Sequence, residues 1–170
     1  MKVKTSEICI YGILGALTFA LKFAMSAFPN IEPVSLLIIV YAIAFGIKAI
    51  YPVSIYVIFE IVFYGVGIWS IGYVYIWFIL LIATLLVRKY FNGTNVLIWA
   101  TISGVYGLAY GALYMPIYIV LGDMTLAVSW WLSGVYYDVV HCVANFILCI
   151  ALFKPLTKLI CTLNKQYKIN

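Results

Sequence analysis

The stretch that decides the fold class of this chain is ICIYGILGALTFALKFAMSAF, residues 8–28. Its only charged side chain is Lys22. At about 1.5 Å rise per residue, a helix of this length crosses the hydrocarbon core of a bilayer. Small residues recur in the stretch at every fourth position, a spacing that favours close approach of two helices in lipid. These residues are Gly12, Ala16, Ala20 and Ala24, and we call them the small-residue ladder.

The composition predicts an integral membrane protein. Of the 170 residues, 67% are hydrophobic and only 9% are charged, whereas a soluble domain carries about 25% charged residues. The ten bases outnumber the five acids, but they are scattered at the ends of apolar segments. This scatter argues against the basic groove of a nucleic-acid-binding protein, and we predict no nucleic-acid partner.

Six apolar segments follow one another along the chain, separated by residues that form turns. Pro33 removes a backbone donor and restricts the residue before it, so the first connection ends there. Asn92-Gly93-Thr94-Asn95 and Gly122-Asp123 form later breaks. We predict an all-α membrane protein with six transmembrane helices in a compact bundle, as one domain over residues 1–170. The predicted spans are about 7–28, 34–48, 51–69, 73–90, 95–120 and 125–153.

The bases predict the orientation, because cytoplasmic loops of membrane proteins are enriched in Lys and Arg. With the N-terminus inside, nine of the ten bases fall on the cytoplasmic side and none falls in the three opposite loops. Glu32 and Asp123 then lie outside, and Lys22 lies within the first span. Both termini are predicted to be cytoplasmic. The nine bases are Lys2, Lys4, Lys48, Arg88, Lys89, Lys154, Lys158, Lys165 and Lys168.

Few ionisable residues fall inside the predicted spans, and such residues usually face a cavity or the bundle interior. Asp138, His141 and Asn145 are spaced i, i+3 and i+7 on the sixth span and share one helix face. Glu60 lies near the middle of the third span, at a depth similar to that of Asp138. Two interpretations stay open: these groups contact a ligand, or they neutralise one another as Asp138–His141 and Glu60–Lys22 pairs.

The sequence predicts neither a metal site nor a catalytic site. His141 is the only histidine, and no second histidine or thiolate lies at ligand spacing. Ser103, Ser129 and Ser133 are not part of a nucleophile-elbow motif. We therefore do not expect an enzyme.

Aromatic residues gather near the predicted outer ends of the spans, most clearly Trp69, Tyr73, Trp130 and Trp131. Such residues form interfacial belts in membrane proteins, but a cluster above buried carboxylates would also suit a flat ligand, including a cationic one. On the fifth span, glycines at i, i+3 and i+7 indicate tight helix packing or room for a ligand. They are Gly104, Gly107 and Gly111.

Six short spans, cytoplasmic termini and the ladder together resemble the substrate-binding S components of energy-coupling factor (ECF) vitamin transporters. In that family, an A-x-x-x-A element on the first helix docks onto a shared transmembrane T subunit. The segment Ala16-Leu17-Thr18-Phe19-Ala20 matches this element, and Gly12 and Ala24 extend it. The resemblance implies that residues 28–33 form the outer loop that covers the substrate, a gating loop that contains Pro29, Asn30, Glu32 and Pro33.

The resemblance also implies a division of labour among partners. Two ATPase subunits use ATP, the T subunit transmits the motion, and the S component captures a vitamin or related heteroaromatic micronutrient outside and delivers it inward. This chain has no phosphate-binding loop, so we expect it to bind no cofactor of its own. The implied location is the plasma membrane of a prokaryote, with the lipid bilayer around a multi-pass chain.

On this interpretation the ionisable and aromatic residues form the substrate site. Its mixture of acids, one histidine and one lysine favours a ligand of positive or mixed charge. Two other classes remain open: an MreD-like membrane scaffold without a small-molecule ligand, and a small intramembrane enzyme suggested by Asp138 and His141. The predicted substrate-binding residues are Glu60, Asp138, His141, Asn145, Trp69, Tyr73, Trp130, Trp131 and Lys22.

Overall fold

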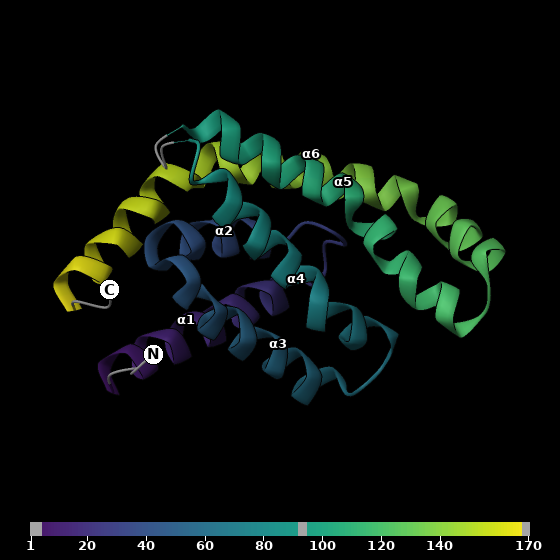
Figure 1. Cartoon of the computed structure of the whole chain (residues 1–170), viewed down its shortest axis with the longest axis horizontal. Coiled ribbons are helices and arrows are strands. Elements are labelled where there is room, and N and C mark those ends of the chain that lie inside the picture. The colour runs from purple at the N-terminus through teal and green to yellow at the C-terminus, as the bar shows by residue number, and fades with distance from the viewer. Residues whose placement is uncertain (1–4, 92–94, 168–170) are drawn as a thin grey trace.

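The computed structural model describes residues 5–91 and 95–167, and these fold into six α-helices and one 3-10 helix, with no strand among them (Figure 1). The all-helical class is therefore confirmed. The elements are α1 (Thr5–Ala24), α2 (Val34–Phe45), η1 (Gly46–Ala49), α3 (Ile50–Tyr64), α4 (Ile68–Val87), α5 (Val96–Leu121) and α6 (Met124–Tyr167).

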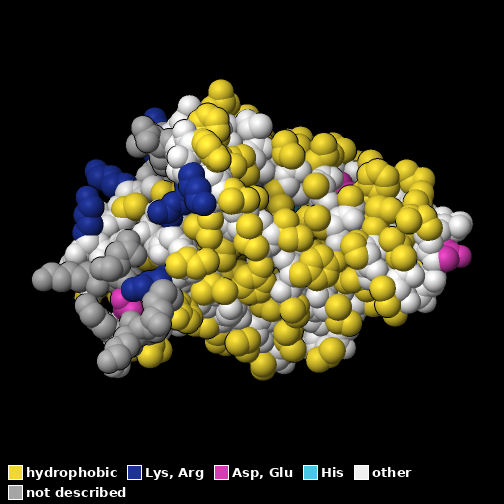
Figure 2. Space-filling model, in the orientation of Figure 1, with side chains coloured by type: hydrophobic (Ala, Val, Ile, Leu, Met, Phe, Trp, Pro, Cys, Tyr) yellow, Lys and Arg dark blue, Asp and Glu magenta, His cyan; other side chains and the backbone are white. Residues whose placement is uncertain are grey.

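Successive helices run back and forth between two ends of the molecule (Figure 1). The start of α1, the η1 turn and the end of α6 lie at one end, and we call it the terminal end. The α3–α4 and α5–α6 connections lie at the other, the loop end, and the α1–α2 connection lies part of the way toward it. Lys and Arg side chains gather toward the terminal end on the face shown in Figure 2, and apolar side chains cover most of the rest. Of the bases behind the predicted orientation, Lys2, Lys4 and Lys168 lie outside the described residues.

Five helical segments of the described chain are long and apolar enough to cross a membrane. One of them, Val34–Tyr64, contains α2, η1 and α3 together. Alone, the 12 residues of α2 and the 15 of α3 would reach only about 18 and 22 Å, less than the roughly 30 Å hydrocarbon core. The helices indicate a multi-pass membrane protein, and six separate crossings remain a prediction.

Helix α2 forms the centre of the bundle. Every residue from Val34 to Phe45 is buried except Ile43, which is partly buried. The helix ends at Gly46, whose φ of +62° is a conformation that glycine adopts without steric strain. The Arg88 guanidinium then donates a hydrogen bond to the Ala42 carbonyl, in the last turn of α2. α2 thus serves as the internal support around which the other helices pack.

The other helices form two groups on either side of α2. Helices α1, α3 and α4 pack as one group, and α5 and α6 pack along each other as a second. The two groups meet through α2 and where α4 touches α5. Glycine permits the close α5–α6 packing, because a Cβ atom at Gly107 would lie 2.8 Å from the backbone carbonyl carbon of His141. At Gly104 and Gly107, tight packing is therefore the correct interpretation.

The small-residue ladder lies on the side of α1 that faces away from the bundle. The buried side of α1 is a different set: Glu7, Tyr11, Leu14, Gly15 and Thr18. Of the ladder residues, Gly12 and Ala16 are partly exposed and Ala20 and Ala24 are exposed. A Cβ atom at Gly12 would meet nothing within 4 Å, whereas one at Gly15 would lie 2.6 Å from Ile55 Cγ2. The close approach of α1 to α3 occurs at Gly15. The ladder is not the surface by which α1 packs against α3.

Several predicted helix ends were wrong. α1 ends at Ala24 rather than at residue 28, and tight turns follow it. α3 ends at Tyr64 and α4 begins at Ile68, whereas the predicted spans ended at 69 and began at 73. Gly65, at a φ of +81°, ends α3. The Ser70 hydroxyl accepts from the Gly67 N–H at 2.7 Å and donates to the Gly65 carbonyl at 2.9 Å, which fixes the start of α4.

The corrected helix ends change the position of Glu60 within α3 and the length of α6. Glu60 lies one turn from the end of α3 rather than near the middle of a span. α6 continues to Tyr167 instead of ending near residue 153. Pro155 lies inside it, and α6 changes direction toward its C-terminal part in Figure 1. A proline lacks the N–H of the helical hydrogen bond and commonly bends a helix without ending it.

Candidate functional site

Three adjoining cavities lie at the loop end of the bundle. The α3–α4 cavity has a volume of about 230 Å³, and Lys22, Glu60 and Tyr73 are among its lining residues. The loop cavity, lined by residues of the 25–33 loop and by His141, has about 300 Å³. The α5–α6 cavity, lined by Asp138 among others, also has about 300 Å³. Trp69 lines all three, and Asn30 and Tyr110 line both larger cavities. These shared lining residues place the three cavities next to one another, and together they form the candidate site.

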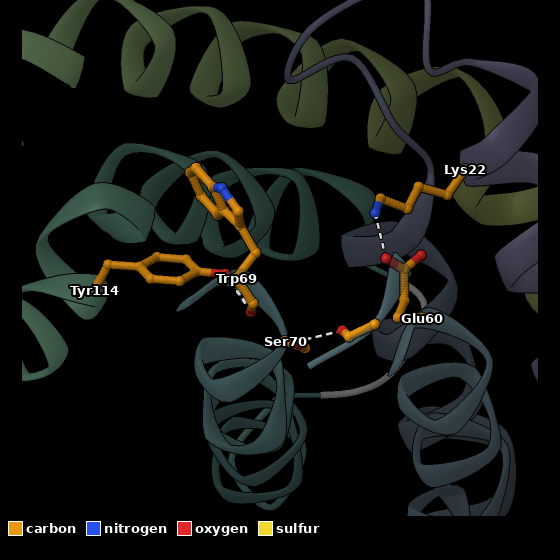
Figure 3. A network of polar contacts seen from close by, with 6 residues as sticks. Lys22, Glu60, Trp69, Ser70 and Tyr114 are labelled. Carbon is orange, nitrogen blue, oxygen red and sulfur yellow. Dashed lines mark hydrogen bonds and ion pairs between the residues drawn. The ribbon is translucent and has the colours of Figure 1, made fainter. Parts of the chain in front are cut away.

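An ion pair forms one wall of the α3–α4 cavity (Figure 3). Lys22 Nζ on α1 lies 2.6 Å from Glu60 Oε2 on α3. The ammonium group also lies over two aromatic rings, 4.9 Å from the Tyr73 centroid and 5.2 Å from that of Tyr64. Glu60 Oε1 and the Tyr56 hydroxyl are both buried and lie near each other, and neither has another hydrogen-bond partner among the described residues. The predicted Glu60–Lys22 pairing is therefore present.

Trp69 is held at the junction of the three cavities. Its backbone carbonyl accepts a hydrogen bond from the Tyr114 hydroxyl at 3.1 Å (Figure 3). Its ring packs against the edge of Tyr114, with centroids 5.0 Å apart, and near Trp130 at 6.0 Å. Gly72 makes room for this arrangement, because a Cβ atom there would collide with the Tyr114 ring. The Trp69 side chain is 57% exposed, which leaves it able to contact a ligand.

Asp138 lines the α5–α6 cavity with one carboxylate oxygen unsatisfied. Its Oδ1 accepts the backbone N–H of Gly111 at 2.9 Å. Its Oδ2 is buried and has no hydrogen-bond partner among the described residues. The indole N–H of Trp131 is a donor close to this carboxylate, and it has no other hydrogen-bond partner among the described residues. The same cavity is lined by Tyr110 and Trp130.

His141 and Asn145 share the buried face of α6 with Asp138, as their spacing predicts, but they behave differently. Neither ring nitrogen of His141 has a hydrogen-bond partner in the described parts of the chain, so the Asp138–His141 pair, one of the two interpretations left open, is not formed. His141 lines the loop cavity and meets the ring of Tyr110 edge-on, with centroids 4.9 Å apart.

Asn145 is a structural residue in this arrangement. Its Nδ2 donates to Ser35 Oγ at 3.1 Å and to the Ser103 carbonyl at 3.2 Å, which links α6 to α2 and α5. It does not appear among the residues that line the three cavities. Its predicted place on the buried face is correct, but it lies outside the candidate site.

The loop at 25–33 closes the loop cavity. Asn30 adopts a φ of +61°, and its Nδ2 donates to the Tyr137 carbonyl on α6 at 2.9 Å. Asn30 and Pro29 line the cavity, whereas Pro33 caps α2. Glu32 also lines it, and burial raises the pKa of this carboxyl to about 7. Lys22 opposes that rise in pKa, and the nearby Glu60 adds to it.

Most of the predicted site residues do come together, from four helices and one loop. The sequence reasoning missed Tyr64, Ser70, Tyr110 and Tyr137, which line one or more cavities. Tyr106, Tyr110 and Tyr114 are spaced by four on α5, so a tyrosine face was readable beside the glycines. The predicted residues that line the site are Lys22, Pro29, Asn30, Glu32, Glu60, Trp69, Tyr73, Trp130, Trp131, Asp138 and His141.

The chemistry of the site suits binding of a small polar molecule between aromatic rings. Carboxylates, an ammonium and an imidazole face cavities whose other walls are largely aromatic, as in many small-molecule sites. Within residues 5–91 and 95–167, no group of three or more His, Cys, Asp or Glu side chains could hold a metal ion. Comparisons with protein-family models, curated proteins and solved structures found no match to this chain.

Proposed function

We propose that this chain is the substrate-binding S component of an ECF-type importer, and that it captures a vitamin or related heteroaromatic micronutrient. The observation that carries the proposal is the set of adjoining cavities near the 25–33 loop. They lie at the end of the bundle opposite the gathered Lys and Arg side chains. In the proposed orientation that end faces outward, where a transported nutrient would enter.

Unsatisfied buried polar atoms favour a ligand-binding role over a scaffold role. Glu60 Oε1, Asp138 Oδ2 and both nitrogens of His141 are buried without a hydrogen bond to the described residues. Leaving such groups unpaired destabilises a folded protein by about 1–3 kcal/mol each. Unpaired atoms also occur away from the cavities, for example at Trp99 and Asn164, so the support comes from those that face a cavity. A binding protein gains affinity when its ligand supplies the missing partners.

The ladder supports the proposed docking surface for a T subunit. Ala16 and Ala20 lie on the outer side of α1, away from its packing against α3. In the proposal, the T subunit packs there and two ATPase subunits hydrolyse ATP. The chain crosses the plasma membrane of a prokaryote six times, with cytoplasmic termini. The Lys154–Lys165 part of α6 then lies at the cytoplasmic surface.

The test separates uptake from ligand binding. Ala16→Leu and Ala20→Leu place a bulky side chain in the docking surface without touching the cavities. Uptake by cells that express the complete importer should fall by at least tenfold in both variants. Ligand retention by the purified chain should be unchanged. Ala151→Leu is the matched control, because Ala151 is an exposed alanine on α6, and this variant should keep both properties.

Two outcomes would contradict the proposal. If the Ala16 and Ala20 variants lose ligand binding along with uptake, the ladder is an internal packing element. If they transport normally, no partner docks at this surface. An intramembrane enzyme would instead be indicated by turnover of a lipid substrate by the purified chain alone.

A further inference from the structure

The cavity walls contain more acidic than basic groups. Within the described parts of the chain, the lining residues include three carboxylates, Glu32, Glu60 and Asp138, and one ammonium, Lys22. At pH 7 Glu32 is about half ionised, because its pKa is about 7, so with Glu60, Asp138 and Lys22 ionised the walls carry a net charge between one and two negative units. Isolated charges are strongly disfavoured in a medium of low dielectric constant. A site of this kind favours a ligand that brings positive charge.

The charge of Lys22 is already balanced within the protein. Its ammonium lies 2.6 Å from Glu60 Oε2 and is flanked by the rings of Tyr64 and Tyr73. A ligand carboxylate or phosphate that bound Lys22 would share the ammonium with Glu60, which is 3% exposed. The cavities would then hold a further negative charge with no further base to balance it. The pairing thus argues against an anionic ligand and removes the main reason to expect a zwitterionic one.

Asp138 is the carboxylate that lacks a countercharge. It is 4% exposed, and its Oδ2 has no hydrogen-bond partner among the described residues. The hydrogen bond from Gly111 satisfies Oδ1 but does not neutralise the charge. No Lys or Arg is found among the residues that line the α5–α6 cavity in the described chain. A cation in this cavity would meet a carboxylate that has no competing cation.

The remaining walls of the α5–α6 cavity suit a flat cation. Trp130, Trp131, Tyr110 and Tyr137 line it, and the faces of such rings attract positive charge. Its volume of about 300 Å³ is at the lower end of the usual range for small-molecule sites, which limits the group to one or two rings. His141, in the adjoining loop cavity, offers two unpartnered nitrogens for hydrogen bonds to an uncharged part of the same ligand.

Resting on the proposed function, we propose that the ligand is a small organic cation, a nitrogen heterocycle whose positive charge lies against Asp138 in the α5–α6 cavity. The aromatic walls stack on the ring, and Asp138 Oδ2 supplies the countercharge. His141 binds a polar substituent that extends beneath the 25–33 loop. The Lys22–Glu60 pair stays intact and forms a wall on the other side of Trp69.

The first experiment identifies the charge of what the protein binds. Native mass spectrometry of the full chain, purified from membranes, should show a retained molecule that carries a positive charge at pH 7. In parallel, thermal unfolding of the ligand-depleted chain is measured with one ring in three charge states: 1-methylnicotinamide, nicotinamide and nicotinate. Thiamine, riboflavin and biotin provide a larger cation, neutral molecule and anion. The cations should raise the midpoint temperature most.

The second experiment places the charge. Asp138→Asn keeps the acceptor for the Gly111 N–H but removes the negative charge, so it should weaken binding of the most stabilising cation at least tenfold. Asp123→Asn is the matched control, because Asp123 is exposed in the α5–α6 turn, and it should bind normally. Trp131→Phe keeps an aromatic wall without the indole N–H and should retain most of the affinity. The wild-type charge measurement stands even where a variant fails to fold.

The outcomes distinguish this inference from the proposed function. A retained neutral or anionic molecule, or greater stabilisation by riboflavin or biotin, overturns the cation inference and leaves a binding protein. Full affinity of Asp138→Asn for the cation overturns the placement of the charge. If no molecule is retained and no compound stabilises the chain, both the cation inference and the proposed S-component function fail.

Discussion

The backbone N–H of Gly111 donates to Asp138 Oδ1 at 2.9 Å, and a Cβ atom at position 111 would collide with the same carboxylate. Gly111→Ala should therefore push Asp138 or α6 away and destabilise the fold by about 1–3 kcal/mol, as overpacking of a close-packed interior does. For a chain of this size that corresponds to a fall of roughly 2–12 °C in the midpoint of thermal unfolding.

Gly134→Ala is the control for that substitution. Gly134 is helical, and a Cβ atom there would meet nothing within 4 Å. Alanine is favoured over glycine inside a helix by up to about 1 kcal/mol, so this variant should unfold at an equal or higher temperature. Equal destabilisation of the two variants would show that the Gly111 effect does not arise from Asp138.

The Lys22–Glu60 ion pair should contribute as a unit. Lys22→Gln or Glu60→Gln alone leaves one buried charge without its partner, a change that destabilises proteins by about 3–5 kcal/mol. The double variant Lys22→Gln/Glu60→Gln removes both charges and should recover part of that loss. A double-mutant cycle on thermal unfolding should give a coupling energy of about 0.5–3 kcal/mol. Strictly additive effects would mean that the two side chains do not interact in solution.

Asn30 should control the opening of the 25–33 loop. Asn30→Gly tolerates the φ of +61° but loses the hydrogen bond to the Tyr137 carbonyl. A hydrogen bond of about 1 kcal/mol corresponds to a roughly fivefold change in the opening equilibrium, because 1.4 kcal/mol is tenfold. Amide hydrogen exchange of a peptide covering 26–33 should accelerate by about that factor.

Asn30→Ala should show a larger effect on exchange, because alanine also disfavours the left-handed conformation. Peptides from the middle of α2 provide the internal reference, since that helix is buried and should exchange at an unchanged rate. Unchanged exchange of the loop in both variants would show that the Asn30 hydrogen bond does not hold it closed.

Glu32 should make the stability of the ligand-free chain depend on pH. Burial raises the pKa of this carboxyl from 4.5 to about 7, so between those values the folded state binds more protons than the unfolded state. Stability then falls as the pH rises from about 4.5 to about 7. The charged or titratable groups that face Glu32 across the cavity are Lys22, Glu60 and His141, with the tyrosines of α3, α4 and α5.

The measurement for Glu32 is the midpoint of thermal unfolding at several pH values. Glu32→Gln should flatten the decline between pH 5 and pH 7, because it removes the titrating group and preserves the size of the side chain. Asp123→Asn, at an exposed carboxylate, should leave the profile unchanged. A wild-type profile that rises over this range would contradict the raised pKa.

Patterns along the chain were sufficient to predict the helical class and the shared face of Asp138, His141 and Asn145. Apolar runs separated by glycine and proline leave helices as the main option in a membrane. The burial of α2 could not be predicted in the same way. A helix that is apolar on all sides can face either lipid or protein, and only the packing of the other helices decides between them.

The helix ends and the full composition of the site also required the structure. The α3–α4 boundary depends on local hydrogen bonds of Ser70 with Gly65 and Gly67, which hydropathy does not report. Tyr110 joins the site because α5 is held close to α6 by Gly107. That approach depends on the fit of two helices distant in the sequence from the 25–33 loop.

The adjoining cavities lie where the α1–α3–α4 group meets the α5–α6 pair, with walls contributed by both groups. A molecule held there would contact both groups of helices and link them. When one protein molecule is stretched by a force applied at its C-terminus, the α5–α6 pair should separate before the other helices. The force needed for this step should be lower in the ligand-free protein than in the ligand-bound protein. With ligand bound, the α5–α6 pair should unfold in the same step as the remaining helices. The unfolding force would then show whether the cavities are occupied.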